Sequence, residues 1–249
     1  MRFDMWYDKR VLVLAGRGRY EDPWHDHAAT SYAVAVELES LGVEVRIRST
    51  FAAAFALLDE VDLLVVNCGR GRPDPAFDGT DEQWQQAHAD VDRYARSGRA
   101  ILGLHQAANT FPDNPGWRSI LGGRWIPGHS MHPPQSVATF TPAGVQPEGV
   151  DSAGIPPVAV HPVVDGLGPV VADDERYCAL DVAETSQILL TTHHDGVDQP
   201  VAWISGGARA IYDGLGHGVE SYASASRRRL LRREAMWLLG APDSEVRAA

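Results

Sequence analysis

Short apolar runs alternate with amphipathic segments along the first 110 residues. Buried or half-buried strands are predicted at residues 10–15, 43–48, 61–68 and 99–104. Helices are predicted between them at residues 28–41, 51–58 and 81–97. Strands that alternate with helices at this spacing predict a parallel sheet joined by right-handed crossovers, and hence an α/β fold.

The second half of the chain is predicted to be richer in strands and to end in a helix. The predicted strands lie at residues 135–141, 178–180, 188–193, 200–204 and 208–213, and the helices at residues 117–121 and 223–240. In the last helix, the side chains of Arg228, Arg229, Arg232 and Arg233 are predicted to face water. Residues 142–157 are rich in Pro and Gly and predict a mobile surface loop. Since no repeat or long hinge divides the chain, we expect a single domain over residues 1–249.

The composition and charge of the chain argue against several classes of binding partner. The formal charge of −11 argues against nucleic acid and anionic membranes. No stretch approaches the roughly 20 apolar residues of a membrane span, and the N-terminus lacks the apolar core of a signal peptide. The two cysteines form no metal or redox motif, which is consistent with reduced thiols. These features predict a cytoplasmic protein.

Histidines follow several of the predicted strands. His105 ends the strand at 99–104 among the small residues Gly103, Ala107 and Ala108, which favours a sharp strand-to-helix elbow. In hydrolases and glutamine amidotransferases the residue at such an elbow is a Ser or Cys nucleophile; here it is a histidine, and a histidine that merely follows a strand is the alternative. Ligands of parallel sheets bind beyond the carboxyl ends of the strands. His25 and His217 follow strands in the same way, whereas His27 and His88 are predicted to face solvent.

A dinucleotide site is not indicated. Gly16 and Gly18 follow the first strand, but the third glycine of the fingerprint is replaced by Glu21. Redox chemistry with a nicotinamide cofactor is therefore a weaker expectation than hydrolysis or isomerisation.

Six segments resemble the trehalose-utilisation (ThuA-like) family, in the same order along the chain. They are GLHQA around His105, LGGRW through GH at His129, HPVVDGL, DDERY, PVAWISGG and GLGHG. The resemblance implies membership of the class I glutamine-amidotransferase-like superfamily and a flavodoxin-like fold, in which a doubly wound, mostly parallel sheet carries helices on both faces. It also implies a role in the catabolism of trehalose and related disaccharides, including keto-sugars. The positions that it marks are His25, His105, His129, Asp174, Glu175, Tyr177, Trp203 and His217.

The chain departs from the family at one turn. Members usually carry Gly-Lys-Gly-Arg after the Trp-containing strand, whereas this chain has Gly206-Gly207-Ala208-Arg209. Any role of that lysine is therefore absent here.

These residues suggest acid/base chemistry on a sugar. Amidotransferase activity is excluded because neither cysteine stands at the elbow, where the mechanism needs a thiolate. We expect His105 and His217 to act as general base and acid, and Glu175 to bind hydroxyls or to serve as a base if burial raises its pKa. Five further residues are expected to bind the substrate: His25, His129, Asp174, Tyr177 and Trp203.

Two questions stay open at this level. His25, His105 and His217 could together hold a divalent metal such as zinc, or they could act on the substrate directly. The function expected is that of a hydrolase or isomerase of a sugar or keto-sugar, and the alternative is a non-catalytic module that binds a carbohydrate or a partner on the same rim. Pairing of two copies through that rim, giving a homo-oligomer, is a third and weaker interpretation.

Overall fold

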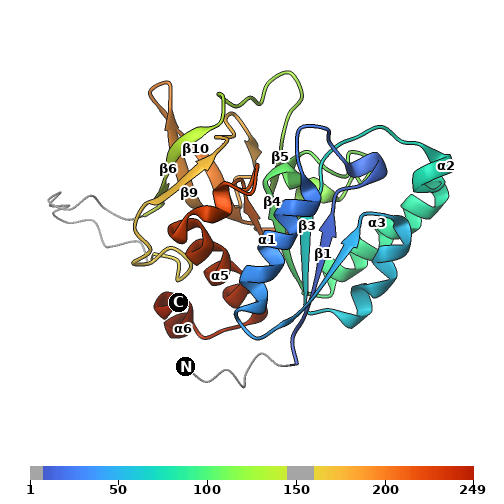
Figure 1. The fold of residues 1–249 in the computed structure, drawn as a ribbon, viewed down its shortest axis with the longest axis horizontal. Coiled ribbons are helices and arrows are strands. Elements are labelled where there is room, and N and C mark those ends of the chain that lie inside the picture. The colour runs from blue at the N-terminus through green and yellow to red at the C-terminus, as the bar shows by residue number, and fades with distance from the viewer. Residues whose placement is uncertain (1–7, 145–159) are drawn as a thin grey trace, which may run out of the picture.

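One large mixed sheet organises the fold (Figure 1). The structure, a computed structural model, describes residues 8–144 and 160–249. Within these ranges nine strands form the sheet in the order β2-β1-β3-β4-β11-β10-β9-β6-β7. The first five in this order are mutually parallel, and each later strand is antiparallel to its neighbour.

The element bounds agree closely with the sequence pattern in the first half of the chain. The strands of the large sheet are β1 (Arg10–Ala15), β2 (Glu44–Ser49), β3 (Leu63–Asn67), β4 (Ala100–Leu104), β6 (Ser136–Pro142), β7 (Val170–Asp174), β9 (Gln187–His194), β10 (Val197–Ile204) and β11 (Ala210–Asp213); β5 (Gly123–Arg124) and β8 (Asp181–Val182) pair separately. The helices are α1 (His27–Glu39), α2 (Pro75–Asp78), α3 (Asp81–Arg96), α4 (Trp117–Leu121), α5 (Ala225–Leu239) and α6 (Asp243–Ala248). None of these helices is both long and apolar enough to pass through a membrane.

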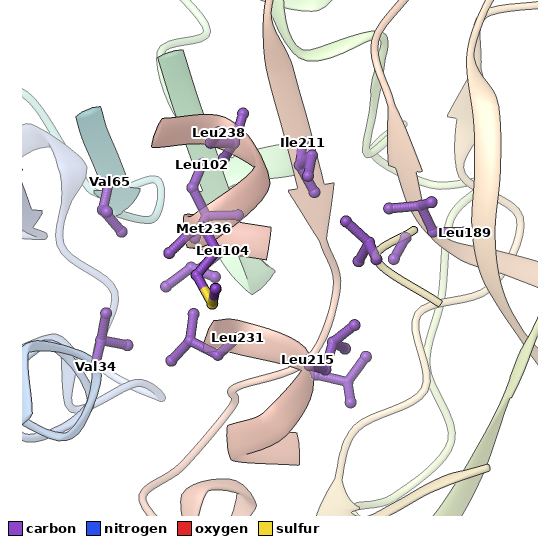
Figure 2. Close-up of a cluster of buried hydrophobic side chains, with 14 of the residues drawn as sticks. Val34, Val65, Leu102, Leu104, Leu189, Ile211, Leu215, Leu231, Met236 and Leu238 are labelled. Carbon is purple, nitrogen blue, oxygen red and sulfur yellow. The ribbon is translucent and has the colours of Figure 1, made fainter. Parts of the chain in front are cut away.

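Apolar side chains cover both faces of the sheet. Along β1, Val11 and Val13 belong to a core that includes α1 and α5, whereas Leu12 and Leu14 belong to a second core that includes α3. Figure 2 shows the first core, in which Leu231 of α5 lies near Leu104 of β4. Burial on both faces explains why these strands are continuous apolar runs, and it confirms the predicted α/β fold with helices on both faces of the sheet.

Two predicted elements differ in the structure. Residues 51–58 lie in a 3₁₀ helix, Ala52–Glu60, rather than an α-helix. The strand predicted at residues 178–180 is displaced: Cys178 forms only an isolated bridge with Met131, the short strand β8 begins at Asp181, and the longer strand β7 precedes the segment. The acidic end of β7 is typical of a turn, but Asp174 is buried and has its own hydrogen-bond donors. The predicted loop at 142–157 falls largely on residues 145–159, outside the described residues.

Three basic side chains predicted to face water are buried. Arg233 of α5 donates to the carbonyl oxygens of Val163 and Asp165. His27 begins α1, and His88 of α3 contacts the Tyr20 hydroxyl, with His88 Nε2 2.9 Å from that oxygen. Each prediction rested on polar neighbours in the sequence, and each of these groups packs instead against residues distant in the sequence.

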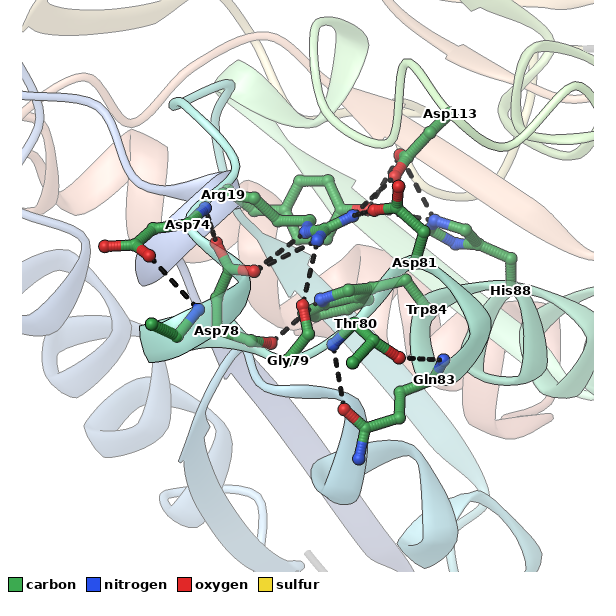
Figure 3. A network of polar contacts seen from close by, with 12 residues as sticks. Arg19, Asp74, Asp78, Gly79, Thr80, Asp81, Gln83, Trp84, His88 and Asp113 are labelled. Atoms are coloured by element: carbon green, nitrogen blue, oxygen red, sulfur yellow. Dashed lines mark hydrogen bonds and ion pairs between the residues drawn. The ribbon is translucent and has the colours of Figure 1, made fainter.

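A buried network fixes the turn that leads from β1 to the loop of His25 (Figure 3). Arg19 Nη2 lies 3.0 Å from Asp78 Oδ1, and both side chains are almost wholly buried. The Tyr20 hydroxyl donates to Asp113 Oδ1 at 2.7 Å. Because Arg19 and Tyr20 immediately precede this loop, their contacts give it a rigid starting point.

The half-buried His161 should make the protein sensitive to acid. Burial against Trp237, at a ring-centroid distance of 4.9 Å, lowers the pKa of His161 to about 4. An unfolded histidine has a pKa of about 6.5, so the unfolded chain binds more protons between pH 6.5 and 4, and stability falls as the pH falls through this window. We expect His161→Gln to lose less stability than the wild type between pH 7 and 4.5, measured as the urea midpoint. The exposed His129→Gln is the control, and equal losses in wild type and His161→Gln would contradict the expectation.

Candidate functional site

The ends of four strands place polar side chains at one edge of the sheet. His105 directly follows β4, Glu175 directly follows β7, and His25 and His217 lie in the loops after β1 and β11. β1, β4 and β11 are parallel, so their carboxyl ends share an edge. Four successive antiparallel pairings then lead from β11 to β7, which consequently runs in the same direction and ends at that edge too.

The four side chains form a compact cluster, called the histidine–glutamate cluster below. His105 Nε2 lies 3.1 Å from His25 Nε2 and 3.4 Å from Glu175 Oε2. His217 Nδ1 lies 3.3 Å from the same Glu175 oxygen. One nitrogen or oxygen atom from each of the four residues lies within 4.8 Å of the others. Three histidines and a carboxylate in this arrangement could hold a divalent metal ion or transfer protons.

Hydrogen bonds on the outer side fix two of the imidazole rings. His105 Nδ1 lies 2.8 Å from the carbonyl oxygen of Gly214, which can only accept, so Nδ1 carries the proton of the neutral ring. His25 Nδ1 lies 2.9 Å from Asp22 Oδ1, and the contact with His25 holds the pKa of Asp22 below its usual range in spite of burial. Asp22 is thus a carboxylate that accepts from His25. The Nε2 atoms of both neutral rings therefore present lone pairs to the cluster.

The elbow predicted at His105 is present and strained. His105 has φ +43°, in the left-handed region, and begins the 3₁₀ turn His105–Ala108. A Cβ on Gly103 would lie 2.5 Å from Leu121 Cδ1, so only glycine fits beneath the turn. The Tyr212 hydroxyl donates to the His105 carbonyl oxygen at 2.9 Å, and the Tyr177 ring packs 4.2 Å from the imidazole. The surrounding packing thus holds a conformation that the residue itself disfavours.

This strain predicts an order of stability. We expect His105→Gly to be more stable to urea than His105→Ala by about 1 kcal/mol, because the left-handed conformation costs a residue with a Cβ about 1–2 kcal/mol that glycine does not incur. Both variants lack the imidazole, so the comparison isolates the backbone. An alanine variant as stable as the glycine variant would show that the elbow relaxes.

Asp174 acts on the site through the backbone. Its carboxylate is fully buried and accepts from the backbone N–H groups of Gly216 and His217, at 2.7 and 3.0 Å, and from the Ser221 hydroxyl at 2.5 Å. A sugar cannot reach this carboxylate, so the expected contact between Asp174 and substrate is wrong. Asp174 instead holds the loop that carries His217.

The expected substrate contact of Trp203 is also contradicted by the geometry. Trp203 is fully buried, and its indole N–H donates to the Leu121 carbonyl oxygen at 2.8 Å, so it is a core residue. His129 is exposed in a turn, and its expected contact with the substrate stays a prediction. The nearby His132 contacts the cluster, with Nδ1 3.3 Å from Glu175 Oε1. The sequence offered two histidines three positions apart, and only the turn distinguishes them.

Aromatic rings line one side of the cluster. Tyr177 is 2% exposed and packs between His105 and the half-exposed Trp125, whose ring centroid lies 4.7 Å from that of Tyr177. The tyrosine is therefore a backing for the site, and Trp125 offers the accessible apolar surface. Trp125, His132 and Asp22 were not singled out from the sequence as site residues. Asp22 could have been identified from its position three residues before His25, because a turn of this length brings the two side chains together.

The surroundings change the pKa values of the acidic and basic groups in different directions. Burial alone would raise the pKa of Glu175, but contacts with His105 and His217 outweigh it and hold this pKa well below its usual range. The condition on which Glu175 was expected to serve as a base, a pKa raised by burial, is therefore not met. Glu175 in turn raises the pKa of His217, whereas burial lowers the pKa of His25. The cluster thus combines a carboxylate, a favourably charged histidine and a histidine kept neutral.

Comparison with known proteins agrees with this fold. The family model described as ThuA, trehalose utilisation, matches residues 10–238. Similar solved structures include a putative ThuA-like protein from Parabacteroides merdae ATCC 43184 (18% identity, TM-score 0.69, covering 93% of this chain and 90% of the other) and one from Bacteroides uniformis ATCC 8492 (16%, 0.69, 96% and 94%). A glutamine amidotransferase from Thermotoga maritima is also similar (10%, 0.52, 94% and 99%), which supports the amidotransferase-like fold. No curated protein matched the chain.

Proposed function

The chain belongs to the ThuA, trehalose utilisation, family, and from this premise we propose that it is an enzyme of carbohydrate catabolism. Its substrate is a sugar or keto-sugar derived from a trehalose-related disaccharide. The observation that carries the proposal is the histidine–glutamate cluster, since three histidines and a glutamate from distant parts of the chain meet where α/β sheets bind ligands. The reaction class that suits the cluster is isomerisation or hydrolysis through proton transfer.

A reaction next to a sugar carbonyl needs positive charge at the carbonyl oxygen. When a proton leaves the carbon beside a carbonyl, negative charge develops on that oxygen, and preorganised positive charge lowers the barrier. In the cluster the Glu175 carboxylate, which lies beside His217 and His105, stabilises such positive charge. We therefore assign the cluster the role of polarising the substrate oxygen.

The proton itself needs a carrier that the substrate can reach. His105 is 1% exposed and its Nδ1 is engaged with Gly214, so it is poorly placed to exchange protons with solvent. The His132 side chain is 39% exposed and lies against the other oxygen of Glu175. Imidazole is the side chain most used for proton transfer near neutral pH. We assign proton transfer to His132 and the binding of the sugar's apolar face to Trp125.

Nuclear magnetic resonance in D₂O tests this function. Purified protein is incubated with a keto-disaccharide made by oxidising one ring hydroxyl of trehalose. Isomerisation places deuterium on the carbon beside the carbonyl, and hydrolysis releases a free monosaccharide. Either product, lost in His132→Ala and retained in the exposed His193→Ala, is the expected result.

A different outcome would overturn the enzyme hypothesis. Saturable binding of the sugar with neither deuterium exchange nor cleavage would identify a carbohydrate-binding module instead. Absence of both binding and turnover would remove this sugar class altogether.

A further inference from the structure

Two imidazole lone pairs face each other inside the cluster. The protons of the neutral His25 and His105 rings lie on their Nδ1 atoms, toward Asp22 and Gly214, while their Nε2 atoms are only 3.1 Å apart. Two acceptors at this distance repel each other unless a cation or a proton lies between them. The short distance between the two Nε2 atoms therefore favours a positive species on the inner side of both rings.

A shared proton would leave other atoms of the cluster without a partner. Glu175 Oε2 and His217 Nδ1 are both buried, and neither has a hydrogen-bond partner among the described residues although they lie 3.3 Å from each other. Both atoms therefore remain available to a ligand within reach of the cluster. One proton between His25 and His105 would not serve this second pair, whereas a single ion would serve all four atoms.

The spacing and type of the atoms suit a transition-metal ion. For metal–nitrogen bonds of about 2.1 Å, neighbouring ligand atoms lie about 3.0–3.4 Å apart, depending on the coordination geometry. The contacts of 3.1, 3.3 and 3.4 Å within the cluster fall in this range. Imidazole nitrogens favour first-row transition metals over Mg²⁺ or Ca²⁺, which prefer oxygen ligands.

The outer hydrogen bonds are also those of a metal site. A metal-bound histidine usually donates its other ring N–H to a carboxylate or a backbone carbonyl, which fixes the ring and its tautomer. Asp22 does this for His25, and the Gly214 carbonyl does it for His105. The backbone of Gly69 packs closely against Asp22, because a Cβ at this position would lie 3.0 Å from Asp22 Cβ and 2.8 Å from Gln106 Oε1.

We propose that His25, His105, His217 and Glu175 bind one divalent first-row transition-metal ion, with Asp22 as the positioning residue for His25. Four protein ligands favour an ion that accepts five or six ligands, such as Mn²⁺, Fe²⁺ or Co²⁺, because such an ion keeps a position for a substrate oxygen. The ion then supplies the positive charge that the proposed function assigns to the cluster. The inference rests on the proposed function for the role of the ion, but its binding can be tested without a substrate.

The test is metal binding by the full chain, purified without a histidine tag and stripped with a chelator. The protein is dialysed against Zn²⁺, Mn²⁺ or Co²⁺, the bound ion is counted by mass spectrometry, and the visible spectrum of the Co²⁺ form is recorded. We expect one ion per chain and a Co²⁺ spectrum with ligand-field bands altered by the imidazole ligands. His25→Ala and Glu175→Gln should weaken binding at least 100-fold, and Asp22→Asn about 10- to 100-fold.

The control is His193→Ala, which removes an exposed histidine that is not part of the cluster and should leave the affinity unchanged. Circular dichroism and thermal melting of the metal-free variants check their folding. If His25→Ala does not fold, the Co²⁺ spectra of the wild type and Asp22→Asn decide the matter, since a spectrum identical to that of the hexaaquo ion in both would overturn the site. Failure of the wild type to bind a stoichiometric ion, or equal binding by a folded His25→Ala, would overturn it as well.

The two proposals fail in different ways. A chain that binds one ion but forms no sugar product upholds the metal site and contradicts the proposed function. A chain that binds no stoichiometric ion yet forms product contradicts the metal site and upholds the function.

Discussion

Glu175→Gln is expected to lower kcat/KM for the keto-disaccharide by at least about 100-fold, the lower end of the range for a lost acid/base group. Glu175 is the one carboxylate that contacts three histidines among the described residues: His105 and His217 through Oε2, and His132 through Oε1. Glutamine keeps the size of the side chain but removes its negative charge, so the cluster loses the charge that balances its cation and fixes His132. Steady-state kinetics by product detection measure the effect.

A matched change elsewhere separates charge at the site from charge in general. Glu184 is exposed, and Glu184→Gln alters the net charge equally without touching the cluster. We expect its kcat/KM to stay within about twofold of the wild type. If Glu175→Gln behaves like Glu184→Gln, the catalytic role of the cluster is refuted.

Arg227→Met is expected to destabilise the protein by about 3–5 kcal/mol, the usual cost of removing one partner of a buried ion pair. Arg227 Nη2 lies 2.8 Å from Asp213 Oδ2, and both side chains are completely buried. Burial raises the pKa of the neighbouring Glu234 well above its usual range, so Glu234 is held neutral and cannot relieve the charge of Asp213. Methionine would leave Asp213 as a buried carboxylate with no cation beside it.

Another arginine on the same helix provides the comparison. Arg232 pairs with Glu37 at 2.7 Å near the surface, and Arg232→Met should cost about 1 kcal/mol or less. Urea unfolding of both variants measures the difference. Similar losses for the two variants would mean that water reaches the Arg227–Asp213 pair.

The parallel half of the fold could be predicted from the sequence because burial on both faces leaves a simple signal. Strands such as β1 and β3 are continuous apolar runs, and the helices α1 and α3 begin at capping side chains, Asp26 and Thr80. The strand β7 could not be predicted, because its residues VVADD do not alternate between apolar and polar although their burial alternates, and because it ends in Asp173 and Asp174. Their acidity indicates a turn unless the donors that Asp174 meets are known, and those donors come from residues 216–221.

The sequence indicated the histidines of the site, but not the roles of the residues that hold them in place. Strand ends and the family resemblance indicated His25, His105 and His217, and the structure brings these three together with Glu175. Trp203 and Asp174 were assigned to substrate because a polar or aromatic residue at a marked position carries no sign of its burial. His132 was indistinguishable from His129 without the turn between them. Whether a given side chain faces the site or the core depends on contacts with residues distant in the sequence. The neighbouring residues in the sequence do not determine it.

The position of Glu175 at the end of β7 has a consequence for how the chain folds. His25 and Glu175 are 150 positions apart, and their strands, β1 and β7, stand near opposite ends of the sheet, separated by β3, β4, β11, β10, β9 and β6. Early pairing of β1, β3 and β4 can bring His25 to His105, but Glu175 joins them only after the last strand has paired. A partly folded intermediate would therefore carry an incomplete site. Ligand binding at the cluster should accordingly report that the whole sheet has formed.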